Sequence, residues 1–363
     1  MADLPSAEDL QNFVRWVEAR KWPLVMLWRK LDKDGSMSLH KGEFAKGLKE
    51  LKYDSDIERL WLALDRDTTG TISFTEFCPE GALSLARFKR WATQTFGGMQ
   101  ALFRALDQDH SGQISLPEFV GGLRAIKGFP PELATGAENI FAMLDSDEGN
   151  GRGGISVDEL AFLDKWRCPP YFWAEPDLHA KERFFAALVR RHDQNPLLAW
   201  RKVLDRDCSM RVSFEEFIAA CTSLARAGLQ EATPSTGVPR LYCAFDEGRS
   251  GWFSLRDWSR EGYEALYNFQ KLAKARSGKV SNFIKSLPQE GNLITGPTFR
   301  IALRELGCAS IEIALLFDAL FAFKGRQVSI SPADVGFLDR WDPDKEMEEE
   351  RAWKTLVAET LGK

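Results

Sequence analysis

The sequence predicts an all-α protein built from tandem helix–loop–helix units that associate in pairs. A short segment with one pattern of acidic, glycine and apolar residues recurs along the chain, and apolar residues at helical spacing flank the copies. One apolar residue also recurs at a fixed place in each copy. About eight such units, forming four lobes of two units each, account for most of the 363 residues.

The repeat is clearest in four segments. LDRDTTGTISFTEF (64–77) and LDQDHSGQISLPEF (106–119) agree in their acidic, glycine and apolar positions, and LDKDGSMSLHKGEF (31–44) and LDRDCSMRVSFEEF (204–217) keep the same frame. Each segment resembles the calcium-binding loop of the EF-hand superfamily. In that family the side chains at loop positions 1, 3, 5 and 12 and the backbone carbonyl of position 7 supply oxygen ligands. The duplicated arrangement is similar to that of calmodulin-like, multi-EF-hand proteins of protists.

The resemblance implies a ligand set for each of these loops. In loop two, 65–76, the set is Asp65, Asp67, Thr69, Thr71 and Glu76. In loop three, 107–118, it is Asp107, Asp109, Ser111, Gln113 and Glu118. In loop one, 32–43, it is Asp32, Asp34, Ser36, Ser38 and Glu43. In loop five, 205–216, it is Asp205, Asp207, Ser209, Arg211 and Glu216.

Position 6 divides these four loops into two classes. It is glycine in loops two and three, at Gly70 and Gly112, where the chain turns with positive φ. Met37 and Met210 stand there in loops one and five. A side chain in the left-handed region costs on the order of 1 kcal/mol, so we expect weaker calcium binding in loops one and five.

The remaining four units keep fewer ligands. Loop four, 145–159, is three residues longer than the standard loop, and its candidate ligands are Asp145, Asp147 and Glu159. Loop six, 246–257, has Gly248 at position 3, and its candidate ligands for a weak or magnesium-like site are Asp246, Ser250 and Asp257. Units seven (287–298) and eight (323–334) lack an acid at position 1 and are expected to be structural.

Position 8 locates all eight units, because in EF-hand proteins an apolar residue there forms a short β-bridge with the partner loop. The candidates are Leu39, Ile72, Ile114, Ile155, Val212, Phe253, Ile294 and Ile330. Their spacing predicts the pairs 1–2, 3–4, 5–6 and 7–8. Amphipathic stripes such as Met99, Leu102, Phe103 and Leu106 before loop three predict the flanking helices.

Two halves of the chain resemble each other. FLDKW (162–166) follows Ile155 at the offset at which FLDRW (337–341) follows Ile330. We therefore expect a four-unit block at 1–167, a proline-rich linker at 168–180, a second block at 181–342 and a C-terminal helix at 343–363. Two apolar stripes near the termini could dock within the chain or on a partner: Leu10, Phe13, Val14 and Val17, and Trp353, Leu356, Val357 and Leu361.

Composition excludes several classes of function. Acids and bases are interspersed around a formal net charge of −5, which gives no basic stripe for nucleic acid and no polybasic segment for lipid. No apolar run is long enough for membrane insertion, and no secretory signal is visible. The six scattered cysteines are typical of reduced thiols. We expect an intracellular, cytoplasmic protein, with cytoskeletal or ciliary association as an open alternative.

The function expected from the resemblance is calcium binding at about four sites, or five if loop four also binds, with Mg²⁺ as a competitor. No catalytic motif such as GxxxxGK[ST], GxSxG or HExxH occurs, so no enzyme activity and no small-molecule substrate are expected. The main hypothesis is a calcium-responsive regulator, or sensor, that contacts another protein. The alternatives are a scaffold that calcium rigidifies and a calcium buffer.

Overall fold

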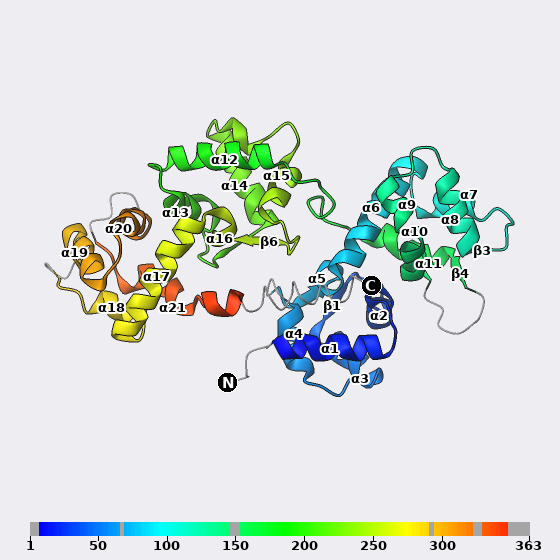
Figure 1. The fold of residues 1–363 in the computed structure, drawn as a ribbon, viewed down its shortest axis with the longest axis horizontal. Coiled ribbons are helices and arrows are strands. Elements are labelled where there is room, and N and C mark those ends of the chain that lie inside the picture. The colour runs from blue at the N-terminus through cyan, green and yellow to red at the C-terminus, as the bar shows by residue number, and fades with distance from the viewer. Residues whose placement is uncertain (1–6, 66–68, 146–152, 290–293, 322–328, 348–363) are drawn as a thin grey trace. The chain divides into compact units, whose positions relative to one another are not determined.

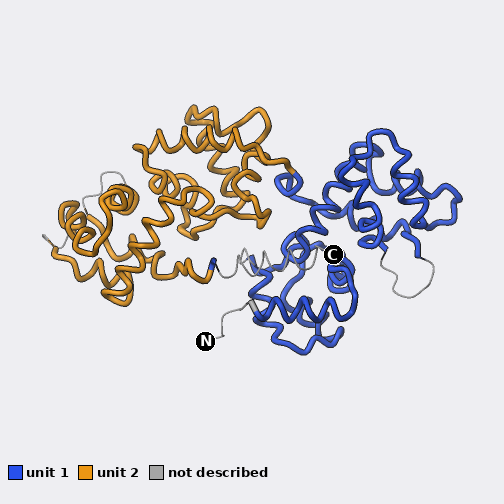
Figure 2. Tube along the Cα trace, viewed as in Figure 1, with its two compact units in different colours: residues 1–173, 346–363 blue, residues 174–345 orange. Residues whose placement is uncertain are grey.

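The computed structural model describes residues 7–65, 69–145, 153–289, 294–321 and 329–347. The chain divides into two compact units, residues 1–173 with 346–363 and residues 174–345 (Figure 2). This division falls within the segment 168–180 for which the sequence predicts a linker. None of the described helices is long and apolar enough to cross a membrane. The predicted C-terminal helix and its Trp353 stripe lie largely outside the described residues.

The described residues of the first unit form helices and four three-residue strands, which loops connect (Figure 1). Its helices are α1 (Ala7–Ala19), α2 (Leu24–Leu31), α3 (Lys41–Glu50), α4 (Ile57–Leu64), α5 (Phe74–Phe77), α6 (Pro79–Phe96), α7 (Met99–Leu106), α8 (Leu116–Ala125), α9 (Pro131–Thr135), α10 (Ala137–Leu144) and α11 (Val157–Lys165). Its strands are β1 (Ser38–His40), β2 (Thr71–Ser73), β3 (Gln113–Ser115) and β4 (Gly154–Ser156).

The second unit repeats this pattern (Figure 1). Its α-helices are α12 (Leu178–Arg191), α13 (Pro196–Ala199), α14 (Phe214–Arg226), α15 (Val238–Phe245), α16 (Leu255–Trp258), α17 (Arg260–Ser277), α18 (Val280–Lys285), α19 (Gly296–Leu306), α20 (Ser310–Leu316) and α21 (Gly336–Arg340). Its strands are β5 (Arg211–Ser213) and β6 (Trp252–Ser254). Its described residues also form two π turns, η1 (Trp200–Leu204) and η3 (Phe317–Phe321), and two 3₁₀ turns, η2 (Gln230–Ala232) and η5 (Pro332–Val335).

The loops associate in antiparallel pairs through their position-8 residues, as the sequence predicted. β1 pairs with β2, β3 with β4 and β5 with β6, and an isolated bridge joins Ile294 to Ile330. The partners opposite each other are Leu39 and Ile72, Ile114 and Ile155, and Val212 and Phe253. All eight residues are buried. In each pair, backbone hydrogen bonds and the contact between the two buried position-8 side chains therefore hold the two loops together.

A capping box ends most loops and begins the helix that follows. Ser115 Oγ accepts a hydrogen bond from Glu118 N, and Glu118 Oε2 accepts from both the amide and the hydroxyl of Ser115. Equivalent pairs are Ser73–Glu76, Ser156–Glu159, Ser213–Glu216, Ser254–Asp257 and Ser331–Asp334. The acid at position 12 thus fixes the start of a helix as well as closing a loop.

Helix α1 docks within the first unit, in agreement with one of the two alternatives for its apolar stripe. Leu10, Phe13, Val14 and Val17 are all buried. The Phe13 ring packs edge-on against Tyr53 and Phe77, with centroids 5.9 and 5.8 Å away. These contacts fix α1 against the helices of the first two loops.

Within the first unit, the first two loops connect to the last two through the FLDKW segment. Arg29 of α2 donates to the Leu144 carbonyl (2.7 Å) and lies over the Phe162 ring at 5.1 Å. Asp164 accepts a hydrogen bond from the backbone N–H of Met99, at the first residue of α7. Lys89 of α6 donates to the Trp166 carbonyl.

The second unit uses FLDRW in the same way. Arg201 donates to the Ala319 carbonyl (2.9 Å) and lies over the Phe337 ring at 4.4 Å. Asp339 accepts from the N–H of Val280 (2.7 Å), and Gln270 donates to the Trp341 carbonyl (2.6 Å). The repeated sequence thus encodes a repeated contact: an arginine clamp on the phenylalanine, a helix cap by the aspartate and a hydrogen bond to the tryptophan carbonyl.

Substituting Ile114 tests the contribution of the loop pairing to stability. Ile114→Ala removes a fully buried side chain opposite Ile155, and we expect the free energy of unfolding to fall by about 3 kcal/mol. Leu116→Ala, two residues away at a side chain that is 40% exposed, is the control and should change it by less than about 0.5 kcal/mol. Urea denaturation followed by circular dichroism measures both. Equal effects would show that the bridge adds no stability beyond ordinary surface contacts.

Candidate metal centres

Carboxylates converge in loops one and three. Among the described residues, two groups of three acids bring one oxygen each to within 4.8 Å of the others: Asp32, Asp34 and Glu43, and Asp107, Asp109 and Glu118. Oxygen clusters of this kind suit a hard cation such as Ca²⁺. In both groups the acid at position 1 is buried and the acid at position 3 is exposed.

In loop three, hydrogen bonds hold the ligand oxygens in place. Asp107 accepts from the amides of Ser111 (3.0 Å) and Gly112 (3.2 Å) through different oxygens. Ser111 Oγ donates to the Gln113 carbonyl at 2.8 Å, which brings the ligand oxygens of positions 5 and 7 together. The Ser111 hydroxyl and amide hold the pKa of Asp109 below its ordinary value, so this carboxylate stays charged.

Loop one has the same geometry with methionine at position 6. Asp32 accepts from the amides of Ser36 (2.9 Å) and Met37 (3.0 Å). Met37 lies at φ 62°, in the left-handed region that the sequence predicted for it. Burial raises the pKa of Asp32 and of Glu43, whereas the amide of Ser36 lowers the pKa of the exposed Asp34.

Loop two is described only in part, because Asp67 lies outside the described residues. Asp65 accepts from the Gly70 amide at 3.1 Å, and Gly70 has the predicted positive φ of 82°. Thr69 Oγ1 donates to the Thr71 carbonyl at 3.2 Å, which matches positions 5 and 7 of loop three. Glu76 is buried and forms a capping box with Ser73 at the start of α5. The bonds at Asp65 and Thr69 therefore match those at Asp107 and Ser111 in loop three.

Three other loops are partly outside the described residues. In loop four, Asp147 lies outside the described residues. Glu159 is buried and forms a capping box with Ser156, and Asp145 is the C-cap residue of α10. Units seven and eight show the Ile294–Ile330 bridge and the Ser331–Asp334 capping box. The part of unit eight that is described therefore keeps the architecture of a loop that ends in a helix.

Loop five is fully described, yet its three acids do not form a group like those of loops one and three. Asp205 is almost completely buried, and its second oxygen accepts from the indole N–H of Trp200 at 3.0 Å. Burial, followed by the nearby carboxylate of Asp207, raises the pKa of Asp205 to about 7. Met210 lies at φ 68°, as predicted. The bond from Trp200 to Asp205 was not predicted from the sequence.

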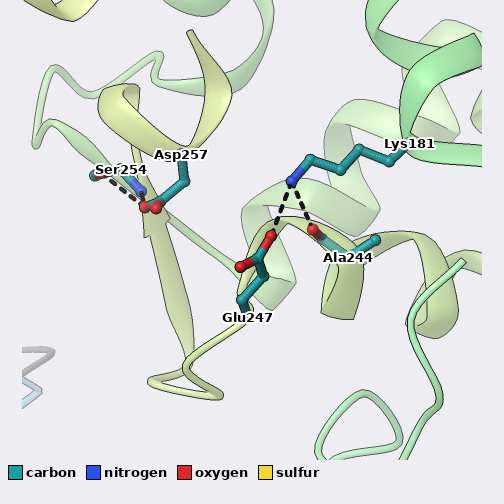
Figure 3. A network of polar contacts seen from close by, with 5 residues as sticks. All are labelled: Lys181, Ala244, Glu247, Ser254 and Asp257. Carbon is teal, nitrogen blue, oxygen red and sulfur yellow. Dashed lines mark hydrogen bonds and ion pairs between the residues drawn. The ribbon is translucent and has the colours of Figure 1, made fainter. Parts of the chain in front are cut away.

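Loop six contains an ion pair as well as the capping box of the other loops (Figure 3). The Lys181 ammonium points at the Glu247 carboxylate (3.5 Å) and donates to the Ala244 carbonyl (2.8 Å). The carboxylate of Asp257 is turned toward Ser254, from whose amide and hydroxyl it accepts at 2.8 and 2.7 Å.

Asp246 and Ser250 remain near each other in loop six. Asp246 is buried and accepts from the Ser250 amide at 2.8 Å, and burial raises its pKa to about 6. Because position 3 is glycine, loop six has only two candidate carboxylates, those of Asp246 and Asp257. Among the described residues, this loop contains no group of three converging acids. The arrangement suits a cation less well than loops one and three.

Comparison with known proteins gives one family match. Residues 99–121, which span α7, loop three and the start of α8, match the EF hand family. No curated protein matches the chain. The matched segment contains one of the two three-acid groups, so sequence and geometry agree in indicating calcium binding at loop three.

Substituting Glu118 separates its two roles, closing the loop and capping the helix. Glu118→Gln keeps an oxygen for the capping hydrogen bonds from Ser115 but removes the charge, and we expect the loss of one tightly bound Ca²⁺ with little change in the melting temperature of the calcium-free protein. Asp334→Asn makes the same change in unit eight, where Ser331 caps the acid in the same way, and serves as the control. Calorimetric titration should show no loss of calcium for this control.

Proposed function

We propose that this protein is a calcium-responsive regulator whose eight helix–loop–helix units are EF-hand units, complete or degenerate, arranged in four lobes. Calcium binds at loops one, two and three, with loop five as a weaker site. Mg²⁺ competes for these loops, and loops four and six contribute at most weak sites. The observation that carries the proposal is the convergence of Asp107, Asp109 and Glu118 in the segment that matches the EF hand family.

Loop geometry supports calcium over a purely structural role for the acids. Loops one and three each combine three carboxylates with a serine hydroxyl that donates to the position-7 carbonyl at 2.8 Å. A cluster of like charges near a buried aspartate is unfavourable unless a cation neutralises it. Calcium accepts this number and type of oxygen ligand and tolerates irregular geometry.

A regulatory role is supported by the surroundings of loop one. Asp32 and Asp34 share a cavity of about 210 Å³ with Phe162 and Lys165, which belong to α11 in the last loop pair of the unit. Phe162 is also the ring beneath Arg29. Two added positive charges at loop one therefore act on Lys165 and on the arginine clamp, which links the ion to the helices beyond its own loop.

The proposed mode of action is contact with another protein inside the cell, without catalysis. The chain's lack of catalytic motifs and its interspersed charge support this choice over an enzyme or a nucleic-acid partner. A buffer and a rigid scaffold are the alternatives. They differ from a regulator in the size of the conformational response to calcium.

Calcium titration of chelator-stripped full-length protein tests the proposal. We expect uptake of about four ions, a rise in melting temperature because the ions bind the folded state, and a change in tryptophan fluorescence, since Trp28 and Trp61 are buried beside loops one and two. Calorimetry, thermal unfolding and fluorescence are measured together, with Mg²⁺ as the control ion.

The outcomes separate a regulator from its alternatives. Uptake and stabilisation with a large spectral change support a regulator, whereas uptake and stabilisation without a spectral change support a buffer or a scaffold that calcium rigidifies. Protein that takes up no calcium would be a scaffold with inherited loops, and the proposal would be wrong.

A further inference from the structure

The carboxylate at position 1 has the same hydrogen-bonding pattern in loops one and three. One oxygen accepts the amide of position 5 and the other accepts the amide of position 6: Ser36 and Met37 for Asp32, and Ser111 and Gly112 for Asp107. Loop six repeats the pattern with Asp246. Both oxygens are thereby turned toward the amides of the loop itself.

Loop five departs from this pattern at Asp205. One oxygen accepts from the Met210 amide at 3.2 Å, as expected for position 6. The other oxygen accepts from the indole N–H of Trp200 at 3.0 Å, and the Ser209 amide donates to Asp207 at 3.0 Å. In loops one and three the position-5 amide donates to the acids at both position 1 and position 3. In loop five the Ser209 hydroxyl and the Met210 amide share one oxygen of Asp205, and the indole occupies the other.

A one-residue shift in the preceding helix produces this contact. The amide of Asp205 donates to the carbonyl of Trp200, five residues earlier, in the π turn η1. The position-1 amides of loops one, two, three, four and six instead donate to an aromatic residue four residues earlier: Trp28, Trp61, Phe103, Phe141 and Tyr242. The π turn adds one residue between the aromatic ring and the loop, and so places the Trp200 indole against Asp205.

Trp28 provides the matching case without the bond. It is fully buried, lines the cavity beside Asp32, and its indole N–H has no hydrogen-bond partner among the described residues. Loop one nevertheless has its three acids converged, whereas loop five does not. The two loops therefore share their ligand types and their position-6 methionine. They differ in that the Trp200 indole donates to the position-1 aspartate and the Trp28 indole does not.

We propose that Trp200 is a negative determinant of calcium affinity: its indole holds the Asp205 carboxylate away from the ion position and makes loop five the weakest of the loops with a full ligand set. The inference rests on the proposed calcium binding. A hydrogen bond to a buried charged group contributes enough that displacing it lowers affinity by about tenfold or more. Loop five then fills at higher calcium concentration than loops one and three.

Two isosteric substitutions in full-length protein give the first test. Asp32→Asn should remove one ion from the tight range of a calcium titration, and Asp205→Asn should leave the number of tight ions unchanged. Each variant keeps one side-chain oxygen, which can still accept from the position-6 amide of Met37 or Met210, so both are expected to fold. If Asp205→Asn removes a tight ion as Asp32→Asn does, the inference is overturned.

Two tryptophan substitutions give the second test. Trp200→Phe removes the indole donor and should add one tight ion, with an affinity gain at loop five of about tenfold. Trp28→Phe removes an equally buried tryptophan that has no such bond, and should leave the number of tight ions unchanged. Calorimetry measures both after circular dichroism has confirmed folding.

The outcomes separate this inference from the proposed function. If wild type binds calcium but Trp200→Phe gains no tight ion, the inference is wrong and calcium binding stands. If no variant binds calcium, both are wrong. If Trp200→Phe fails to fold, the comparison of Asp32→Asn with Asp205→Asn decides the question by itself.

Discussion

The pairing of neighbouring loops through buried position-8 residues is the constraint on which the rest of the structure depends. Each loop offers a short extended segment whose backbone groups must be satisfied, and the adjacent loop supplies the partners. The pairing explains why units seven and eight keep Ile294 and Ile330 without keeping most calcium ligands. Loss of the apolar bridge would expose the backbone of the partner loop, whereas loss of a candidate ligand leaves this pairing in place, as in units seven and eight.

Above the level of pairs, each unit is held together by a second repeated contact. Arg29 and Arg201 reach carbonyls at the ends of distant helical segments and lie over Phe162 and Phe337. Arg201 is four residues before its loop and Arg29 is three, but the π turn compensates, so both guanidinium groups make the same contact. The contact of the arginine is therefore the same in both units, although Arg201 lies one residue further from its loop than Arg29 does. The same one-residue shift places Trp200 against Asp205.

The variation among the loops then has a physical order. Loops one and three bring three carboxylates together, loop six lacks a side-chain ligand at position 3, and loop five has every ligand type with one carboxylate turned toward an indole. An array with graded sites can respond over a wider range of calcium concentration than identical sites allow. In the proposed regulator, the cavity that loop one shares with Lys165 would couple the ion to the neighbouring pair of loops.

The sequence by itself determined the helical class, the four loop pairings and the acids that converge in loops one and three. Those features depend on local spacing, which a linear pattern records: an acid every second residue, an apolar residue at position 8 and a serine three residues before the capping acid. The positive φ of Met37 and Met210 followed for the same reason.

Tertiary structure alone decided what surrounds each ligand. The sequence contains a hint, since Trp200 stands five residues before its loop where Trp28 stands four residues before, but the spacing does not say where the extra residue goes. The π turn absorbs it because Arg201 is anchored on Ala319 and Phe337, more than a hundred residues away along the chain. Hydrogen bonds to a buried carboxylate depend on such distant packing, and so the orientation of Asp205 is set by the folded unit.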